Sequence, residues 1–129
     1  PAENVPWQKQ YMSKEDQLEY KFIFCPEGND VSTNLKWAMS SNSICLMPKP
    51  RYETWFMEGL LKPGIHYVEL KSDYSDLDEK IDYYSTHILE AETIIENAHQ
   101  YVARFQNKDL EDLLSIKVLE RYFELSGQL

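Results

Sequence analysis

The sequence predicts an α/β fold built on a small parallel sheet. Three short apolar runs, "YKFIFC", "SICLM" and "IHYVEL", are separated by segments of helical periodicity. Uniformly apolar runs of this length are typical of strands covered on both faces, and crossovers through helices favour parallel pairing. Three strands make a narrow sheet, so we expect either further strands before Pro1 or one half of a larger two-domain fold.

The first third of the chain carries one helix signal before the first strand and one after it. Ser13, followed three residues later by Asp16, resembles a capping box and predicts a short helix. A strand is expected over residues 20–25. Apolar residues at helical spacing then predict a helix over residues 32–41, followed by a second strand over residues 43–47.

The middle of the chain predicts two further helices around the third strand. In "PKPRYETWFMEGLLKPG", prolines precede a helical stripe and Pro-Gly follows it. This stripe is expected in the core and consists of Tyr52, Trp55, Phe56 and Leu60. The third strand is expected over residues 65–70. Ser75 is then expected to cap a helix with Asp78 in its first turn and with a buried face of Leu77, Ile81 and Tyr84.

The last third is predicted to be helical throughout. Spacings of three and four residues mark an apolar face made of Ile88, Ala91, Ile95, Ala98, Val102 and Phe105. A final helix over residues 109–125 is expected to bury Leu110, Leu114, Val118 and Tyr122. The chain should therefore end in a helical segment.

Composition narrows the class of protein. Residues 1–11 contain two prolines and no periodicity, so we expect a linker there and one domain over residues 12–129. The formal charge of −9, with no basic stripe, argues against a nucleic-acid partner. Cys25 and Cys45 lie in apolar runs and are expected to be reduced core residues, which favours a reducing compartment. The sequence shows neither a membrane-spanning run nor a signal-peptide pattern, so a cytoplasmic location is expected.

The turn "PEGNDVSTNLK" between the first strand and its helix is a candidate anion site. The first N–H groups of a helix lack partners within the helix and can hold a phosphate. The residues that could contribute are Gly28, Asn29, Asp30, Ser32, Thr33, Asn34 and Lys36. The turn matches neither dinucleotide-binding nor P-loop spacing. An ordinary turn with Ser32 as a helix cap and a solvated Lys36 explains the same residues, and both interpretations stay open.

Glu53 and Glu58 are the acidic candidates. Each could accept hydroxyl groups of a ribose or hexose, as carboxylates do in dinucleotide sites. Alternatively, Glu53 complements a helix N-terminus and Glu58 is a surface residue. The three histidines lack ligand spacing, and the acidic "DLD" fits a helix start, so no metal site and no catalytic triad is expected.

The combination of several runs resembles a known family. "GNDVSTNLKW", "SNSICLMPKP" and "ETWFMEGLLKPGIHYVELKSD" are similar to the carboxyl-terminal half of glycosyltransferase family 90, in particular its bacterial lipopolysaccharide-core branch. The similarity covers about residues 12–125. Eukaryotic relatives are protein O-glucosyltransferases and O-xylosyltransferases, which share the glycine turn, a lysine at the Lys36 position and the "KP..HY" element.

This resemblance implies a Rossmann-like parallel sheet with helices on both faces, forming the donor half of a GT-B glycosyltransferase. It implies a UDP-hexose donor, no metal and no cofactor, and a lipid-linked core oligosaccharide as acceptor in lipopolysaccharide or other surface-glycan synthesis. Where eukaryotic relatives carry a diphosphate-binding arginine, this chain has Asn34, so the main positive charge at the leaving group would come from Lys36, from the helix dipole or from the missing half. Glu53 and Glu58 are separated by four residues, whereas many GT-B enzymes carry two glutamates separated by seven.

The resemblance also divides the expected activity between two halves. The general base and the acceptor site are expected in the amino-terminal half, and the 129 residues alone are expected to bind nucleotide without transferring sugar. Peripheral contact with the inner face of the cytoplasmic membrane stays open. The alternative is a non-catalytic nucleotide-binding or interaction module of a surface-polysaccharide assembly system. A receiver domain is disfavoured because no acidic pair ends the first strand.

Overall fold

A computed structural model describes residues 10–128 and has the α/β class predicted from the sequence. The linker expected over residues 1–11 therefore lies almost entirely outside the described residues. The elements, in chain order, are α1 (Lys14–Gln17), β1 (Phe22–Phe24), α2 (Leu35–Ala38), β2 (Ile44–Pro48), the 3-10 helix η1 (Glu58–Leu60), β3 (Val68–Leu70), α3 (Leu77–Thr86), α4 (Ile88–Ala103), the 3-10 helix η2 (Arg104–Gln106) and α5 (Lys108–Ser126).

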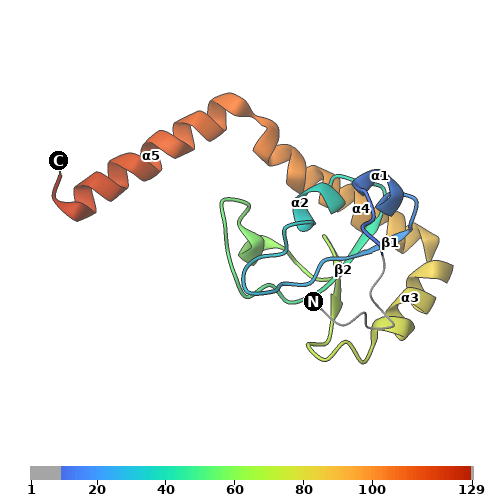
Figure 1. The fold of residues 1–129 in the computed structure, drawn as a ribbon. Coiled ribbons are helices and arrows are strands. Elements are labelled where there is room, and N and C mark those ends of the chain that lie inside the picture. Colours follow the sequence, from blue (N-terminus) through green and yellow to red (C-terminus); the bar gives the residue numbers. More distant parts are fainter. Residues whose placement is uncertain (1–9, 129) are drawn as a thin grey trace.

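The three strands form one parallel sheet in the order β1-β2-β3. Phe22 aligns with Ile44 across the first pair, and Leu46 aligns with Val68 across the second. The parallel sheet predicted from the sequence is therefore confirmed. Because all three strands run the same way, the segments that follow them meet at one edge of the sheet, which we call the carboxyl edge (Figure 1).

Alternate strand residues enter two separate cores, and helices contribute to both. One core joins Ile23, Cys25, Cys45 and Met47 to Leu35, Ala38 and Met39 around α2 and to Ala98 and Tyr101 of α4. The other joins Ile44, Leu46, Val68 and Leu70 to Ala91 and Ile94 of α4, with Leu77, Ile81 and Tyr84 of α3 packed against it. Period-two alternation thus places apolar side chains on both faces of the sheet, as expected for a covered parallel sheet.

The two cysteines are free and buried, as predicted. Contact with the Cys45 thiol and burial raise the pKa of the Cys25 thiol above its ordinary value. Burial among apolar side chains disfavours the thiolate. Both residues therefore serve as small apolar core residues.

Two capping predictions have different outcomes. The capping box of α1 is confirmed, because the Ser13 hydroxyl accepts the Asp16 N–H and the Asp16 carboxylate accepts the Ser13 N–H. The expectation that Ser75 caps α3 is wrong by one residue, since Asp76 precedes the first helical residue. The buried Asp76 carboxylate instead accepts the backbone N–H of Lys71 at 2.9 Å, which closes the turn after β3.

The helix expected over residues 32–41 is much shorter than predicted. α2 is a single turn, Leu35–Ala38, and Asn34 at its N-cap makes no side-chain capping bond. Ser32 therefore does not cap the helix. The residues on either side of α2 form turns, because polar side chains there make hydrogen bonds with nearby backbone and side-chain groups.

The helix expected after β2 is wrong. Residues 51–57 are irregular, and only the 3-10 turn η1 follows. Of the expected apolar stripe, Phe56 is buried, whereas Tyr52, Trp55 and Leu60 are exposed. Aromatic side chains carry no strong helix propensity, and Glu58, for which a ligand contact and a surface position were both open, is buried in this segment.

For the two long helices, the predicted bounds agree with the structure better than the predicted buried residues do. In α4, Ala91 and Ala98 are buried as expected, but Ile88 is exposed, and Ile94 and Tyr101 are core residues that the pattern missed. In α5, all four residues expected to be buried, Leu110, Leu114, Val118 and Tyr122, are exposed. Figure 1 shows α5 extending away from the sheet.

We predict that the two helices contribute very differently to the stability of this chain. Ile94→Ala should lower the free energy of unfolding by about 2–5 kcal/mol, because it removes a side chain from the second core. Val118→Ala on α5, where the side chain is 68% exposed, should change it by no more than about 0.5 kcal/mol. Urea denaturation followed by circular dichroism measures both, and equal losses would contradict the fold described here.

Candidate functional site

The carboxyl edge of the sheet contains a pocket of about 360 Å³. It draws residues from the segments that follow all three strands, which is where ligands bind in parallel α/β sheets. Its charged and aromatic lining consists of Glu27, Lys49, Arg51, Glu69, Lys71 and Tyr74. Neither Lys49 nor Lys71 forms an ion pair within residues 10–128. This pocket therefore combines free cations with carboxylates at the place where a ligand is expected.

Glu27 fixes the loop that leaves β2, a role that no sequence pattern indicated. Its carboxylate accepts the backbone N–H groups of Arg51 and Tyr52 at 3.0 to 3.1 Å and the Arg51 Nε–H at 3.2 Å. Backbone N–H groups of an irregular loop have no partners from regular secondary structure, so they need other hydrogen-bond acceptors. Glu27 supplies them, and it thereby joins the loop after β1 to the loop after β2.

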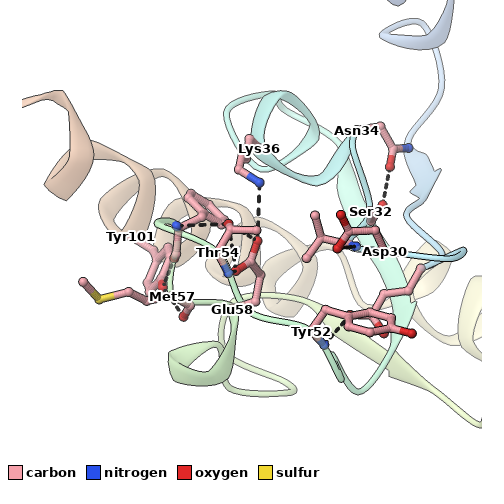
Figure 2. Close-up of polar contacts among 12 residues, drawn as sticks. Asp30, Ser32, Asn34, Lys36, Tyr52, Thr54, Met57, Glu58 and Tyr101 are labelled. Atoms are coloured by element: carbon pink, nitrogen blue, oxygen red, sulfur yellow. Dashed lines mark hydrogen bonds and ion pairs between the residues drawn. The ribbon is translucent and has the colours of Figure 1, made fainter. Parts of the chain in front are cut away.

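The predicted phosphate turn is held by its own side chains. Asp30 Oδ1 accepts the Val31 N–H at 2.8 Å, the Ser32 hydroxyl donates to Asn34 Oδ1, and Asn34 Nδ2 donates to the Phe24 carbonyl at 2.9 Å. Figure 2 shows Asp30, Ser32 and Asn34 on this turn. These three side chains therefore stabilise the turn, whereas Thr33 is exposed.

The same turn borders a shallow hollow of about 510 Å³, to which Gly28, Asn29 and Thr33 also contribute. Within the described part of the chain, no hydrogen bond engages the backbone N–H groups of Ser32, Thr33 and Asn34. Successive unpartnered N–H groups can bind an anion without a long helix. Because α2 has only one turn, these N–H groups, and not a helix dipole, are what this segment offers to a ligand.

Lys36 and Glu58, both predicted to contact ligand, contact each other. Lys36 Nζ lies 3.3 Å from Glu58 Oε1, and Glu58 is only 2% exposed. The Thr54 N–H and hydroxyl donate to the same carboxylate at 2.7 to 2.8 Å. Figure 2 shows the three side chains converging. The alternative that Glu58 is a surface residue is wrong, and so is the alternative that Lys36 is simply solvated.

The surroundings of Glu58 keep it ionised. Burial raises the pKa of its carboxyl group, but hydrogen bonds from Thr54 and the charge of Lys36 outweigh burial and leave the pKa below its usual range. Lys36 also lies 5.4 Å from the Trp55 ring centroid and 5.3 Å from that of Phe56. The ammonium group is therefore held by a carboxylate and two aromatic rings.

Tyr101 of α4 anchors the irregular loop from the other side. Its hydroxyl lies 2.7 Å from the Phe56 carbonyl and 2.8 Å from that of Met57, as Figure 2 illustrates. Met57 has a φ of 55°, a left-handed conformation that is uncommon for residues other than glycine. The hydroxyl thus satisfies carbonyl groups at the point where the chain reverses into η1.

Glu53 lies apart from Glu58. It is exposed, and its carboxylate lies against Gly59, where an added Cβ would come within 3.1 Å of Glu53 Oε1. Two other carboxylates line the carboxyl-edge pocket: Glu27, which is already bonded to the loop after β2, and Glu69 on β3. Its Oε2 accepts the Tyr67 hydroxyl at 3.0 Å. The sequence pattern missed Glu69 because it looked like a polar residue in an otherwise apolar strand.

The histidines show no arrangement for metal binding or nucleophilic catalysis. His87 stacks on Tyr83, and His99 Nε2 lies 2.8 Å from the Ser41 carbonyl. Among residues 10–128, no three His, Cys, Asp or Glu side chains form a group that could hold a metal ion. Over the same residues, no helix has both the length and the apolarity that a membrane crossing requires.

The polar pocket at the carboxyl edge of this parallel sheet lies where α/β domains bind their ligands. The family model for glycosyl transferase family 90 matches residues 3–127. The chain belongs to glycosyl transferase family 90, which confirms the resemblance inferred from the sequence.

Three relatives illustrate the breadth of the similarity. O-glucosyltransferase LpsA of Dichelobacter nodosus is 48% identical over 93% of this chain and 38% of its own length. Protein O-glucosyltransferase 2 of Danio rerio is 27% identical over 85% of this chain and 22% of its own. Uncharacterized protein 179R of Invertebrate iridescent virus 6 is 38% identical over 56% of this chain and 7% of its own. The chain thus spans well under half the length of these relatives.

We predict that the ion pair of Glu58 is structural and pH-dependent. Glu58→Gln should lower the free energy of unfolding at neutral pH by about 1–3 kcal/mol, because it removes a charge-assisted acceptor from Thr54 and Lys36. Since folding lowers the pKa of Glu58, its stabilisation is present above the usual carboxyl range and is lost as pH falls through the folded pKa. The difference between the variant and the unaltered protein should therefore shrink on acidification.

Glu53→Gln is the matched control for this experiment, because Glu53 is an exposed carboxylate in the same loop. It should change the free energy of unfolding by no more than about 0.5 kcal/mol at any pH. Urea titrations at several pH values measure both variants. A loss in Glu58→Gln that is independent of pH would mean that packing, and not charge, explains the role of Glu58.

Proposed function

We propose that this chain is the donor-binding part of a hexosyltransferase that uses a nucleotide sugar, with UDP-hexose as the donor. The observation that carries the proposal is the carboxyl-edge pocket of a family 90 chain, which combines Lys49, Lys71 and Glu69. The 48% identical relative is called an O-glucosyltransferase, which favours glucose as the hexose. The donor half of a GT-B enzyme is the architecture that this function would require.

The charge requirement of the reaction assigns a role to the two lysines. When the glycosidic bond to the donor breaks, negative charge develops on the departing nucleoside diphosphate and must be stabilised. Lys36 was one source of positive charge expected from the sequence, but it pairs with Glu58. Lys49 and Lys71 line the pocket without an ion-pair partner within residues 10–128. We assign the diphosphate to them, with the free N–H groups of residues 32–34 as further donors.

The sugar hydroxyl groups need acceptors, and Glu69 is the best placed carboxylate. Glu69 borders the carboxyl-edge pocket and also an adjoining pocket of about 360 Å³ between Lys49, Gly59 and Tyr67. Its bond with the Tyr67 hydroxyl fixes one oxygen and leaves the other to accept a ligand hydroxyl. Burial, together with Glu69, raises the pKa of Tyr67, which keeps its hydroxyl a donor. Glu69 therefore takes the role that the sequence suggested for Glu53 and Glu58.

The proposal extends to the whole protein. The acceptor saccharide, which we propose to be a lipid-linked core oligosaccharide in lipopolysaccharide or other surface-glycan synthesis, would bind outside these residues, as would the general base. The enzyme would act without a metal or a cofactor, in the cytoplasm or peripherally at the inner face of the membrane. Saccharide and nucleotide sugar, and not nucleic acid, would be its partners.

We predict that UDP binds at the carboxyl edge. In a proton–nitrogen NMR titration, UDP and UDP-glucose should shift the amides of residues 32–34, Lys49 and Lys71. GDP and ADP carry the same diphosphate, so they serve as controls that show whether the site also recognises the base. The double variant Lys49→Gln/Lys71→Gln should weaken UDP binding about tenfold, because it removes two charge-assisted contacts to phosphate. Lys21→Gln, at an exposed lysine before β1, removes one charge elsewhere and should leave UDP binding unchanged.

Assays of sugar transfer distinguish an enzyme from the alternative, a non-catalytic module. Lys49→Gln, Lys71→Gln and the double lysine variant should reduce sugar transfer in the longest natural form of the protein that contains this chain. Lys36→Ala is unsuitable for this purpose, since it breaks the pair with Glu58. Silence with every nucleotide, together with full transfer activity in these variants, would overturn the proposed site.

We further predict that Glu69 recognises the sugar and not the nucleotide. Glu69→Gln should weaken the binding of UDP-glucose about fivefold relative to the binding of UDP, because a neutral amide accepts a hydrogen bond from a hydroxyl group less strongly than a carboxylate does. Isothermal titration calorimetry with the two ligands gives this ratio. Glu53→Gln is the matched carboxylate control and should leave it unchanged. Equal weakening of both ligands would place Glu69 at the diphosphate or assign it a structural role.

A further inference from the structure

A second pocket, of about 490 Å³, lies at the opposite end of β3 from the carboxyl edge. It is formed by the turn that precedes β3 and by the last part of α4, with Lys62, His66, Asn97, Tyr101 and Arg104 among its lining residues. No carboxylate is among them. In a chain of formal charge −9, a pocket lined by two permanent cations and a histidine, with no acid, is a local exception.

The cations of this pocket are not used to stabilise the fold through ion pairs. Neither Lys62 nor Arg104 takes part in an ion pair within the part of the chain that the structure describes. The guanidinium group of Arg104 lies 5.4 Å from the Tyr101 ring centroid. Tyr101 is itself fixed by its bonds to the loop before η1. Stacking on a rigid ring pre-organises the Arg104 fork for an anion.

His66 adds a donor whose orientation is set by the backbone. The Lys62 N–H donates to His66 Nδ1 at 2.9 Å, so the neutral ring carries its proton on Nε2. Within residues 10–128, no hydrogen bond engages that nitrogen. The His66 ring also lies 5.2 Å from the Tyr101 ring. The pocket therefore offers the ammonium of Lys62, the guanidinium of Arg104 and one imidazole N–H to a ligand.

We propose that this pocket is a second anion site, distinct from the carboxyl-edge pocket, that binds a phosphomonoester group. A tetrahedral dianion can accept from a guanidinium fork, an ammonium and an imidazole N–H together, which suits phosphate better than a monovalent anion. The proposal does not depend on the proposed function, because it concerns other residues at the other end of the strand. A phosphorylated saccharide and a lipid headgroup share this chemistry.

The electrostatics of His66 agree with this assignment. Burial lowers the pKa of His66, and the charges of Lys62 and Arg104 lower it further. The imidazole is thus neutral near neutral pH and faces two positive charges with Tyr101 beside it. A bound dianion would oppose those charges and raise the pKa of His66. Binding of phosphate and protonation of His66 should therefore favour each other.

The test is a proton–nitrogen NMR titration of the chain, near neutral pH, with inorganic phosphate, with glucose 6-phosphate and with phosphatidylcholine vesicles that contain phosphatidic acid. We expect saturable shifts at Lys62, His66 and Arg104 with at least one probe, and a His66 pKa that rises when that probe is bound. The probe that binds most tightly identifies the source of the phosphate group.

Charge-removing variants make the test specific. Lys62→Gln and Arg104→Gln should each weaken binding roughly three- to tenfold, and Arg104→Gln should also raise the His66 pKa without any ligand. Lys21→Gln is the matched control and should bind as the unaltered chain does. The proposal is overturned if no probe gives saturable shifts at these residues, if shifts are confined to Lys49 and Lys71, or if the control loses binding equally.

Discussion

The buried carboxylate of Glu58 is the constraint on which the loops around the candidate site depend. A buried charge is tolerated only when it is paired and hydrogen-bonded, so Lys36 and Thr54 must stay within reach of it. This requirement joins α2 to the segment after β2, although neither has enough regular structure to hold the other. Glu27 acts in the same way on the first residues of that segment. Two acids thus order loops that the sheet itself leaves unpaired.

This use of acids changes which residues can act on a ligand. A carboxylate saturated by backbone N–H groups and a lysine has little capacity left for sugar hydroxyls, and a paired lysine has less charge to offer to phosphate. Glu27, Lys36 and Glu58 are therefore elements of the scaffold. The groups with remaining capacity are Lys49, Glu69 and Lys71 on and beside β2 and β3. Charge alone does not distinguish ligand-binding candidates from structural residues. The candidates also lie at the carboxyl edge and have hydrogen-bonding or ion-pairing capacity that the fold does not use.

Sequence patterns predicted correctly those structural features whose causes lie within a short stretch of the chain. The three strands, the parallel pairing and the Ser13 capping box follow from apolar runs, short connections and a three-residue spacing, all readable along the chain. The helix expected between the second and third strands could not be rejected that way, because what prevents it is the contact of Glu58 with Lys36 and of Tyr101 with the Phe56 carbonyl. These are contacts between residues far apart in sequence. For the same reason Lys36 was recognised as a cation near the site, but its partner was not.

The distribution of charge along β3 explains how an acidic chain can bind anions selectively. A net charge of −9 repels phosphate from most of the surface, and at physiological salt such repulsion reaches only about 8 Å. Anions can then be held where cations are free and acids are already engaged or absent. Lys71 follows β3 at one end, whereas Lys62 and His66 precede it at the other. Because the sheet separates the two clusters, a nucleotide at one end and a phosphomonoester at the other would occupy the protein without competing for the same side chains.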